Sequence, residues 1–309
     1  MRVIQSLKDL DENSFIGLTI GNFDGVHLGH RQLLSKIKSE CTDRKLKFVV
    51  LTFVPHPQKI LQPDKKHFLI NSYFERRKYL EALGVDILVE LPFTRDFSTL
   101  SPEDFLKHHL LGIDKLSKLY LGYDFAFGAN KQGSFDLVQE HCSPRDIEVE
   151  VQPKYKYINE IVSSTSIRQK VCSGDVEGAE VYLGRPFSLE GVVVKGEGRG
   201  RKIGFPTANI QISSDLIIPH RGVYITRTKY AGMNYNSVTN IGFNPTFKDE
   251  SLINIETNVF DFDSYIYGEN IHVEFLKKIR DEKKFSTVND LIDQIRNDVE
   301  SAKIFLKRK

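Results

Sequence analysis

The sequence predicts an α/β protein with two modules. An N-terminal domain built on a parallel sheet is followed by a C-terminal antiparallel β barrel or sandwich with a terminal helix. Over residues 15–160 short apolar runs alternate with helical patterns, whereas after about residue 185 short β-branched runs are separated by glycine and asparagine. The length of 309 residues also suits two domains, which we place at 1–184 and 185–309.

Strands and helices alternate in the predicted first domain. Strands are expected at 15–20, 47–53, 85–91, 116–122 and 147–153. Helices are expected at 72–84, 101–112 and 134–142. Ser72 and Glu75 form a capping-box pattern and Gly84 ends that helix, while Ser101 is an N-cap followed by Pro102. This alternation predicts right-handed crossovers and ligand binding beyond the carboxyl ends of the strands.

The predicted second domain contains short strands punctuated by turn residues. These strands are expected at 189–196, 222–232, 234–242, 252–263 and 270–279. A helical connector over 173–187 ends at Gly184 and Pro186. Apolar residues at 288, 291, 292, 295 and 299 have the spacing of one face of a terminal helix.

The composition limits the classes of function. A net charge of +2 argues against a protein that holds nucleic acid by charge alone. Three widely spaced cysteines suggest buried free thiols in a reducing compartment. Neither a secretory signal nor an apolar run of about 18 residues, as a membrane span needs, is evident, so we expect a cytoplasmic protein without a membrane partner.

The segment TIGNFDGVHLGH (19–30) is the first candidate site, because glycines and histidines gather where a strand gives way to a helix. Glycine lets the backbone approach a ligand, and the free N–H groups of a helix start favour anions. His27 and His30 share a face if the helix has begun. A phosphate site is favoured over a zinc site, over ordinary buried histidines and over a simple turn. The remaining candidate nucleotide contacts in this segment are Gly21, Asn22, Phe23, Asp24 and Gly25.

Three further motifs follow in the first domain. In IVSSTSIR (161–168), Ser163, Ser164 and Thr165 offer hydroxyl and N–H groups at a helix start, and Arg168 offers a rigid cationic fork. A plain helix cap with a surface arginine is the alternative. His56 lies in FVPHPQKIL (53–61) between two prolines, so its backbone is stiff and extended, either at a substrate or in a surface turn.

GYDFAFGANKQGS (122–134) is the last of these motifs. Phe125 or Phe127 stacks on flavin or adenine, or both belong to an alternating core strand. Asp124 is a further candidate flavin contact.

Together, the H-x-G-H element and these motifs resemble the FAD synthetase module of bacterial bifunctional riboflavin kinase/FAD synthetases, within the nucleotidyltransferase superfamily. The resemblance implies a Rossmann-like domain in which His27 and His30 contact the triphosphate of ATP. FMN attacks the α-phosphorus and pyrophosphate leaves. The family commonly has arginine where Ala126 and Lys131 stand, and an acidic residue where Ser134 stands. The effect of these three differences on FMN affinity is left open.

GVVVKGEGRGRKIGFPTANI (191–210) is the candidate site of the second module. The segment contains no predicted helix, which argues against a dinucleotide-binding fold. It still suits phosphates, or else it is a solvated loop. Its candidate ATP contacts are Gly198, Gly200, Arg201, Lys202, Gly204, Thr207 and Asn209.

The PTAN sequence within that segment, with NIGFNPTF (240–247) and NIETNVFDFDSYIYG (254–268), resembles riboflavin kinase and implies a β barrel. By this resemblance Thr207 and Asn209 organise Mg²⁺ and the phosphates of ATP, and Glu256 is the catalytic base. A carboxylate suits that role because the ribityl hydroxyl is a weak acid. Arg280 lies in a basic run that resembles a flap over flavin or nucleotide, with a solvated turn as the alternative.

The whole resemblance implies an enzyme that converts riboflavin and ATP to FMN and ADP, and FMN and ATP to FAD and pyrophosphate, with Mg²⁺ as cofactor. No nucleic-acid partner is expected, and the oligomeric state is open. Two alternatives remain. One is an enzyme in which one module has lost its activity, and the other is a flavin or nucleotide sensor without turnover.

Overall fold

A computed structural model describes residues 1–10, 13–123, 125, 127–129, 132–158, 160–243 and 253–307. The chain divides into two compact units. The first comprises Met1–Lys66 and Tyr73–Ser163, and the second comprises His67–Ser72 and Ser164–Lys309. The predicted domain boundary after residue 184 stays a prediction, while the structural division lies between Ser163 and Ser164.

A six-stranded parallel sheet forms the centre of the first unit, in the order β1-β4-β3-β2-β5-β6. Its strands are β1 Arg2–Ile4, β2 Ile16–Ile20, β3 Lys47–Val54, β4 Ile87–Pro92, β5 Leu116–Gly122 and β6 Glu148–Gln152. All five predicted strands are confirmed, and β1 is an additional edge strand. It was missed because three residues are too few to show a period.

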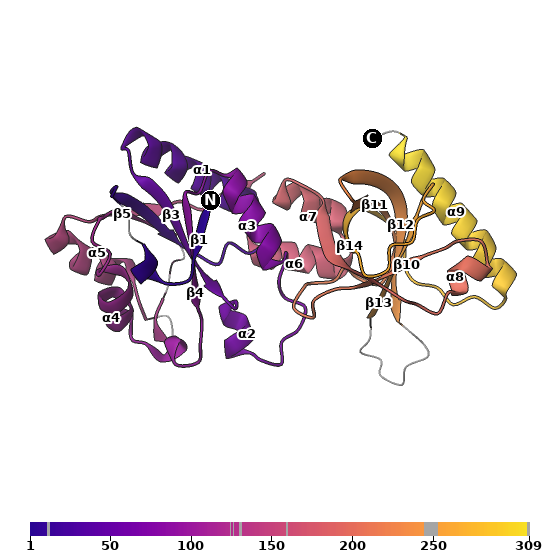
Figure 1. The fold of residues 1–309 in the computed structure, drawn as a ribbon, viewed down its shortest axis with the longest axis horizontal. Helices are drawn as coiled ribbons and strands as arrows, with labels where there is room; N and C mark the ends of the chain where they lie inside the picture. The colour runs from indigo at the N-terminus through magenta and orange to yellow at the C-terminus, as the bar shows by residue number, and fades with distance from the viewer. Residues whose placement is uncertain are drawn as a thin grey trace. The chain divides into compact units, whose positions relative to one another are not determined.

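Helices cover both faces of this sheet (Figure 1). They are α1 Leu28–Asp43, α2 Pro57–Leu61, α3 Tyr73–Ala82, α4 Pro102–Phe105 with a π-helical continuation Leu106–Leu110, and α5 Phe135–Cys142. α1 and α3 pack on one face, against Phe48 and Val50 of β3. α4 and α5 pack on the other face, against Val49 and Leu51. Neighbouring residues of one strand therefore enter opposite cores, as strand geometry requires. A two-stranded hairpin, β7 Lys156–Tyr157 and β8 Glu160–Ile161, completes the unit.

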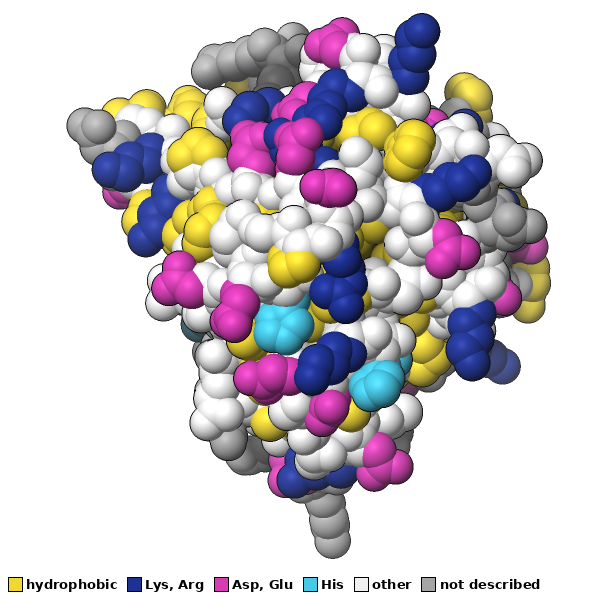
Figure 2. Space-filling model, turned by 90° about the vertical axis from the view of Figure 1, so that its left-hand side faces the viewer, with side chains coloured by type: hydrophobic (Ala, Val, Ile, Leu, Met, Phe, Trp, Pro, Cys, Tyr) yellow, Lys and Arg dark blue, Asp and Glu magenta, His cyan; other side chains and the backbone are white. Residues whose placement is uncertain are grey.

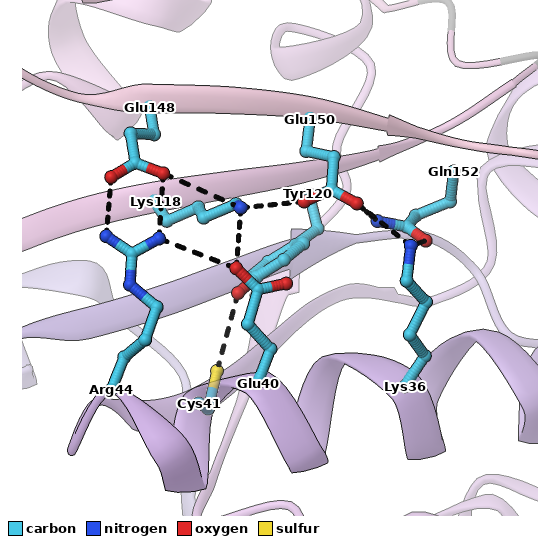
Figure 3. A network of polar contacts seen from close by, with 9 residues as sticks. All are labelled: Lys36, Glu40, Cys41, Arg44, Lys118, Tyr120, Glu148, Glu150 and Gln152. Carbon is cyan, nitrogen blue, oxygen red and sulfur yellow. Dashed lines mark hydrogen bonds and ion pairs between the residues drawn. The ribbon is translucent and has the colours of Figure 1, made fainter.

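A network of charged side chains joins α1 to β5 and β6 (Figure 3). The ammonium group of Lys118 lies 2.6 Å from Glu40 Oε1 and 2.6 Å from Glu150 Oε2. Its side chain is only 9% exposed. Arg44 pairs with Glu148 at the end of the same helix, and Lys36 donates to Glu150. This network fastens the helix that begins at the histidine motif to the edge of the sheet.

The second unit is centred on a closed antiparallel barrel, in the order β10-β13-β12-β11-β14-β9. Its strands are β9 Phe187–Val194, β10 Ala208–Gln211, β11 Gly222–Tyr230, β12 Met233–Phe243, β13 Ile253–Val259 and β14 Asn270–Arg280. The barrel resolves the choice between barrel and sandwich. Five buried hydroxyls form a chain of hydrogen bonds of 2.8–2.9 Å inside it, from Thr226, Thr228, Ser237, Thr239 and Thr257.

The described residues of the second unit also form the helices α6 Ser164–Ser173, α7 Val176–Leu183, the short α8 Arg199–Lys202 and α9 Val288–Leu306. α7 ends at Gly184, as predicted, and the structure shows Gly184 in the left-handed conformation. α9 packs along the outside of the barrel (Figure 1), with buried Ala302 in a cluster that includes Val223, Ile225 and Leu276.

The segment His67–Ser72 also belongs to the second unit. The Phe68 N–H donates to the Asp215 carbonyl at 2.8 Å, and the Ile217 N–H donates to the Leu69 carbonyl at 2.8 Å. No local pattern predicted this pairing, because its two segments lie far apart in the chain.

Cys41 and Cys142 are buried free thiols, as expected, whereas Cys172 is exposed. Burial raises the pKa of the Cys41 thiol to about 11. In the described part of the chain, no helix combines the length and the apolar character needed to cross a membrane. Acidic and basic side chains are interspersed over the face drawn in Figure 2.

Candidate active sites

The loop that follows β2 is tightly folded and mostly buried. Phe23, Asp24 and Val26 are each at most 5% exposed. Phe23 has φ of +48° and Val26 has φ of +37°, although neither is glycine. Such conformations cost free energy and persist only where the surroundings fix them. The predicted nucleotide loop therefore has one fixed conformation at the carboxyl end of a central strand.

His27 and His30 lie side by side at the start of α1. His27 is the N-cap, and its Nδ1 accepts a hydrogen bond from the His30 N–H at 3.2 Å. The two rings stack with centroids 3.6 Å apart, and Phe23 meets His30 edge-on at 5.3 Å. The predicted shared face is confirmed. Both imidazoles lie where the helix dipole favours negative charge.

The second loop, after β3, holds His56 in a fixed position. His56 is 5% exposed and caps α2, its Nδ1 accepting a hydrogen bond from the Gln58 N–H at 3.2 Å. Its own N–H donates to the Tyr73 hydroxyl at 2.7 Å. His56, whose backbone the flanking prolines stiffen, is thus also the residue that caps α2.

A buried charged group that the sequence analysis missed lies near these loops. Arg76 of α3 and Glu90 of β4 are each 2% exposed, and Arg76 Nη1 donates to the Asn22 carbonyl at 3.0 Å. Arg77 Nε also donates to Glu90, at 3.1 Å. Burial lowers the pKa of Arg76, and the neighbouring Glu90 opposes this. The sequence does contain one indication of this buried group, because Glu90 is a charged residue within the apolar run of a buried strand.

Phe125 and Phe127 lie in an aromatic group. Their rings stack with centroids 5.0 Å apart, and Phe127 lies 5.4 Å from Phe105. Both are partly buried against the core of the sheet. Their proposed contact with flavin stays a prediction. Asp124, Ala126 and Lys131 lie outside the described residues, while Ser134 is the N-cap of α5.

The serine-rich motif lies at a helix start, as the sequence predicts, and the helix belongs to the second unit. α6 begins at Ser164, so Ser164 and Thr165 occupy a helix start, and Ser163 directly precedes it. Arg168 is half-buried, and its Nε donates to the Phe68 carbonyl at 2.5 Å. One edge of the guanidinium thus contacts the His67–Ser72 segment. The phosphate roles of these residues stay predictions.

The glycine-rich segment of the second unit differs from the sequence prediction in one respect. A four-residue helix, α8, begins after Gly198, where no helix was expected. Arg201 and Lys202 lie on this exposed turn, and Gly204 follows it with φ of +86°. One helical turn is too short to give a periodic signal, and four residues do not make the crossover helix of a dinucleotide fold.

Two glycines bring this segment against the predicted metal and phosphate ligands. A Cβ on Gly196 would clash with the Asn209 amide, and one on Gly200 would clash with the Phe205 carbonyl and lie 3.2 Å from Thr207 Oγ1. Only glycine permits this close approach. Thr207 and Asn209 thus lie under a backbone that can also offer N–H groups to phosphates.

Glu256 lies on β13 in the same region of the barrel. It is the register partner of Asn209 on β10 and of Asn240 on β12. It is half-buried, and its Oε1 accepts a hydrogen bond from Asn254 Nδ2 at 2.6 Å. On the same face, Asn258 Nδ2 donates to the Pro206 carbonyl at 2.7 Å and holds the FPTAN segment to β13. The predicted base and the predicted metal ligands are therefore neighbours.

Arg280 has a structural partner that the sequence did not indicate. Its Nε and Nη2 contact Asp298 of α9 at 3.1 and 2.7 Å, and Asp298 is 4% exposed. The basic run containing Arg280 is part of strand β14 up to that residue, so only its remainder is loop. A contact between Arg280 and flavin stays a prediction.

The two predicted magnesium ligands, Thr207 and Asn209, both offer oxygen atoms to a metal. Over the described ranges, no cluster of three or more His, Cys, Asp or Glu side chains is arranged to hold a metal ion. The Thr207 hydroxyl and the Asn209 amide oxygen are the hard donors that Mg²⁺ takes. These two residues fit a magnesium ion that keeps water and phosphate oxygens as its other ligands.

Comparisons with known proteins match both units. The sequence profile of FAD synthetase matches residues 10–166, and that of riboflavin kinase matches residues 183–306. A curated relative from Bacillus subtilis, described as a bifunctional riboflavin kinase/FMN adenylyltransferase, is 36% identical over 288 residues, covering 92% of this chain and 90% of the relative. Relatives with the same description from Listeria monocytogenes and Escherichia coli K12 are each 34% identical, covering 94% and 99% of this chain and 92% and 98% of the relatives.

A solved structure matches the chain along its length. The crystal structure of a Streptococcus pneumoniae protein, described as a macrolide-efflux protein, has a TM-score of 0.86 and 32% identity, covering 97% of this chain and 98% of that chain.

Proposed function

The chain belongs to the family of bifunctional riboflavin kinases/FMN adenylyltransferases, and we propose that it makes FAD from riboflavin in two ATP-dependent reactions. The C-terminal module phosphorylates riboflavin to FMN, and the N-terminal module joins FMN to AMP with release of pyrophosphate. One observation carries this proposal. The chain matches relatives described by both activities over at least nine-tenths of their length, and the profiles of the two modules match in order.

In the kinase reaction we assign proton acceptance to Glu256. Its carboxylate takes the proton of the ribityl hydroxyl as that oxygen attacks the γ-phosphorus of ATP, and ADP leaves. Because Glu256 Oε1 already accepts a hydrogen bond from Asn254 Nδ2, we assign proton acceptance to Oε2. Thr207 and Asn209 would hold Mg²⁺, which when bound neutralises charge on the phosphates. Gly198, Gly200, Arg201, Lys202 and Gly204 are the proposed contacts to ATP.

The adenylyl transfer needs no general base. The phosphate of FMN is mostly ionised at neutral pH, since its second pKa is about 6. The chain has instead to offset repulsion between anions and to align the reactants. We assign the triphosphate to His27, His30 and the start of α1, and further phosphate oxygens to Arg168. The proposed flavin contacts are His56, Phe125 and Phe127 in this module, and Arg280 in the other.

Incubation of the full chain with riboflavin, ATP and Mg²⁺, followed by separation of the flavins and nucleotides, tests the proposal. We expect FMN, ADP, FAD and pyrophosphate, and we expect chelation of the metal to stop both reactions. Accumulation of FMN alone would favour the enzyme with one inactive module. Ligand-induced thermal stabilisation without ADP or pyrophosphate would favour the sensor. Because ATP is a co-substrate and Cys41 and Cys142 are reduced, we place these reactions in the cytoplasm.

A further inference from the structure

Two side chains from the first turn of α3 reach the two candidate substrate loops of the first unit. Arg76 contacts the loop 21–25 and Tyr73 contacts the loop 55–57. We propose that Tyr73 and Arg76, together called the α3 clamp, are positioning residues for adenylyl transfer that hold these loops in a fixed relation. This inference rests on the proposed function of the N-terminal module.

Arg76 contacts the backbone of the nucleotide loop. Its Nη1 donates to the Asn22 carbonyl at 3.0 Å, and the Thr52 hydroxyl donates to the same carbonyl at 3.4 Å. The next residue, Phe23, is in the left-handed region, as is Val26. A loop with two such residues relaxes unless neighbouring groups fix it. Arg76 is placed to supply that restraint at Asn22, directly before Phe23.

Arg76 is itself held in place. Its Nη2 lies 3.5 Å from Glu90 Oε1, and its guanidinium lies 4.9 Å above the Tyr73 ring. A buried ion pair adds little net stability compared with apolar packing. The presence of the Arg76–Glu90 pair beside a substrate loop is therefore better explained by the hydrogen bond from Arg76 to Asn22 than by a gain in stability.

Tyr73 fixes the second loop. Its hydroxyl accepts the His56 N–H at 2.7 Å, which sets the backbone of the residue that caps α2. Residues three apart on a helix lie on the same face, so Tyr73 and Arg76 extend from one face of α3 and contact each other. β2 and β3 are paired parallel strands, and the loops at their carboxyl ends are neighbours. One helix turn thus controls two loops that we assign to different substrates.

The test compares R76M and Y73F in the full chain, with KM and kcat measured for FAD formation from FMN and ATP. We expect R76M to raise the KM for ATP at least about tenfold, the low end for a hydrogen bond that involves a charged group. Y73F removes one hydroxyl and keeps the ring, so we expect it to raise the KM for FMN about threefold and leave that for ATP unchanged. Riboflavin phosphorylation by the same molecules should be unaffected, and urea unfolding followed by circular dichroism controls for the fold of the first unit.

R77M is the matched control, because Arg77 binds Glu90 but its side chain is 41% exposed and, within the described part of the chain, it hydrogen-bonds to neither loop. We expect it to leave both KM values near wild type, and R76K to recover part of the affinity for ATP. Equal effects of R76M and R77M would overturn the clamp, and so would a Y73F variant with an unchanged KM for FMN. If R76M fails to fold, Y73F alone decides. A wild-type chain that makes no FAD would instead refute the proposed function.

Discussion

Asn254 donates a 2.6 Å hydrogen bond to Oε1 of Glu256, two residues further along the same face of β13. Asn209 and Asn240 are register partners of the same glutamate on the two adjacent strands. The Asn254 amide thus orients the carboxylate through a neutral hydrogen bond, and two further asparagines occupy the neighbouring register positions. An oriented carboxylate with one oxygen already bound suits a base that receives a proton on the other.

Glu256→Gln should abolish most riboflavin kinase activity. Glutamine keeps the shape of the side chain but cannot accept the hydroxyl proton, so we expect at least about a 100-fold fall in kcat. FAD formation from supplied FMN should stay near wild type, since it needs no base. Measuring both reactions on one preparation checks this. An equal loss of both activities in a folded protein would contradict the assignment of separate sites.

Asn254→Ala should lower kinase kcat about tenfold, the low end for a hydrogen bond to a charged group. The carboxylate would stay in place but lose its fixed orientation. Asn234→Ala is the control, because Asn234 is exposed at the far end of β12. Steady-state rates at saturating riboflavin and ATP measure the effect. A variant as fast as the control would show that Glu256 needs no orienting partner.

His30→Ala should have the reverse selectivity. The loss of one imidazole at the start of α1 removes a group that stabilises negative oxygens as pyrophosphate leaves, and we expect about a 100-fold fall in FAD formation. Kinase activity should be retained. The ring stacks on His27, so circular dichroism and the kinase rate together verify the fold. Retained FAD synthesis would argue that the triphosphate binds elsewhere.

The fold was largely readable from the sequence because its signals are local. Apolar runs such as 47–53 specify buried strands, and Ser101 with Pro102 specifies a helix start that the structure confirms. The π-helical turn Leu106–Leu110 and the short β10 had no such signal. The pairing of Leu69 with Leu216 depends on distant segments, and no local pattern predicts it.

In the candidate sites, too, the sequence predicts local contacts but not contacts between distant segments. The adjacency of His27 and His30 follows from their spacing, and so does the pairing of Asn254 with Glu256, which alternation along a strand would have indicated. The role of Tyr73 and Arg76 could not be foreseen, because their contacts are side chain to backbone across separate segments. Such contacts depend on the packed fold and not on a motif.

Asp298→Asn should loosen α9 from the barrel. The substitution leaves the 14%-exposed Arg280 side chain without its carboxylate, at a cost of roughly 3 kcal/mol in the free energy of unfolding. Arg280→Met should cost a similar amount. If Arg280 also contacts flavin, only its own substitution should raise the KM for riboflavin as well. Urea unfolding and kinase kinetics on both variants separate the two roles, and equal KM values would assign Arg280 to structure alone.

Lys118→Met should destabilise the first unit in a pH-dependent way. Burial alone would raise the pKa of the Glu150 carboxyl. Hydrogen bonds from Lys118, Lys36 and Gln152 outweigh burial and lower this pKa from 4.5 to about 2. A carboxyl whose pKa is depressed on folding adds stability above its unfolded pKa, and that stability is lost as the pH falls. In the wild type we therefore expect a loss between about pH 4.5 and 2.

The Lys118→Met variant should lose roughly 2 kcal/mol at pH 7 and show a weaker pH dependence over that range. The control is Lys36→Met, because Lys36 binds the same Glu150 but its side chain is 55% exposed, so its loss should cost less than about 1 kcal/mol. Urea unfolding followed by circular dichroism at several pH values measures both. A Lys118 variant with the full wild-type slope would show that other groups set the acid sensitivity of this unit.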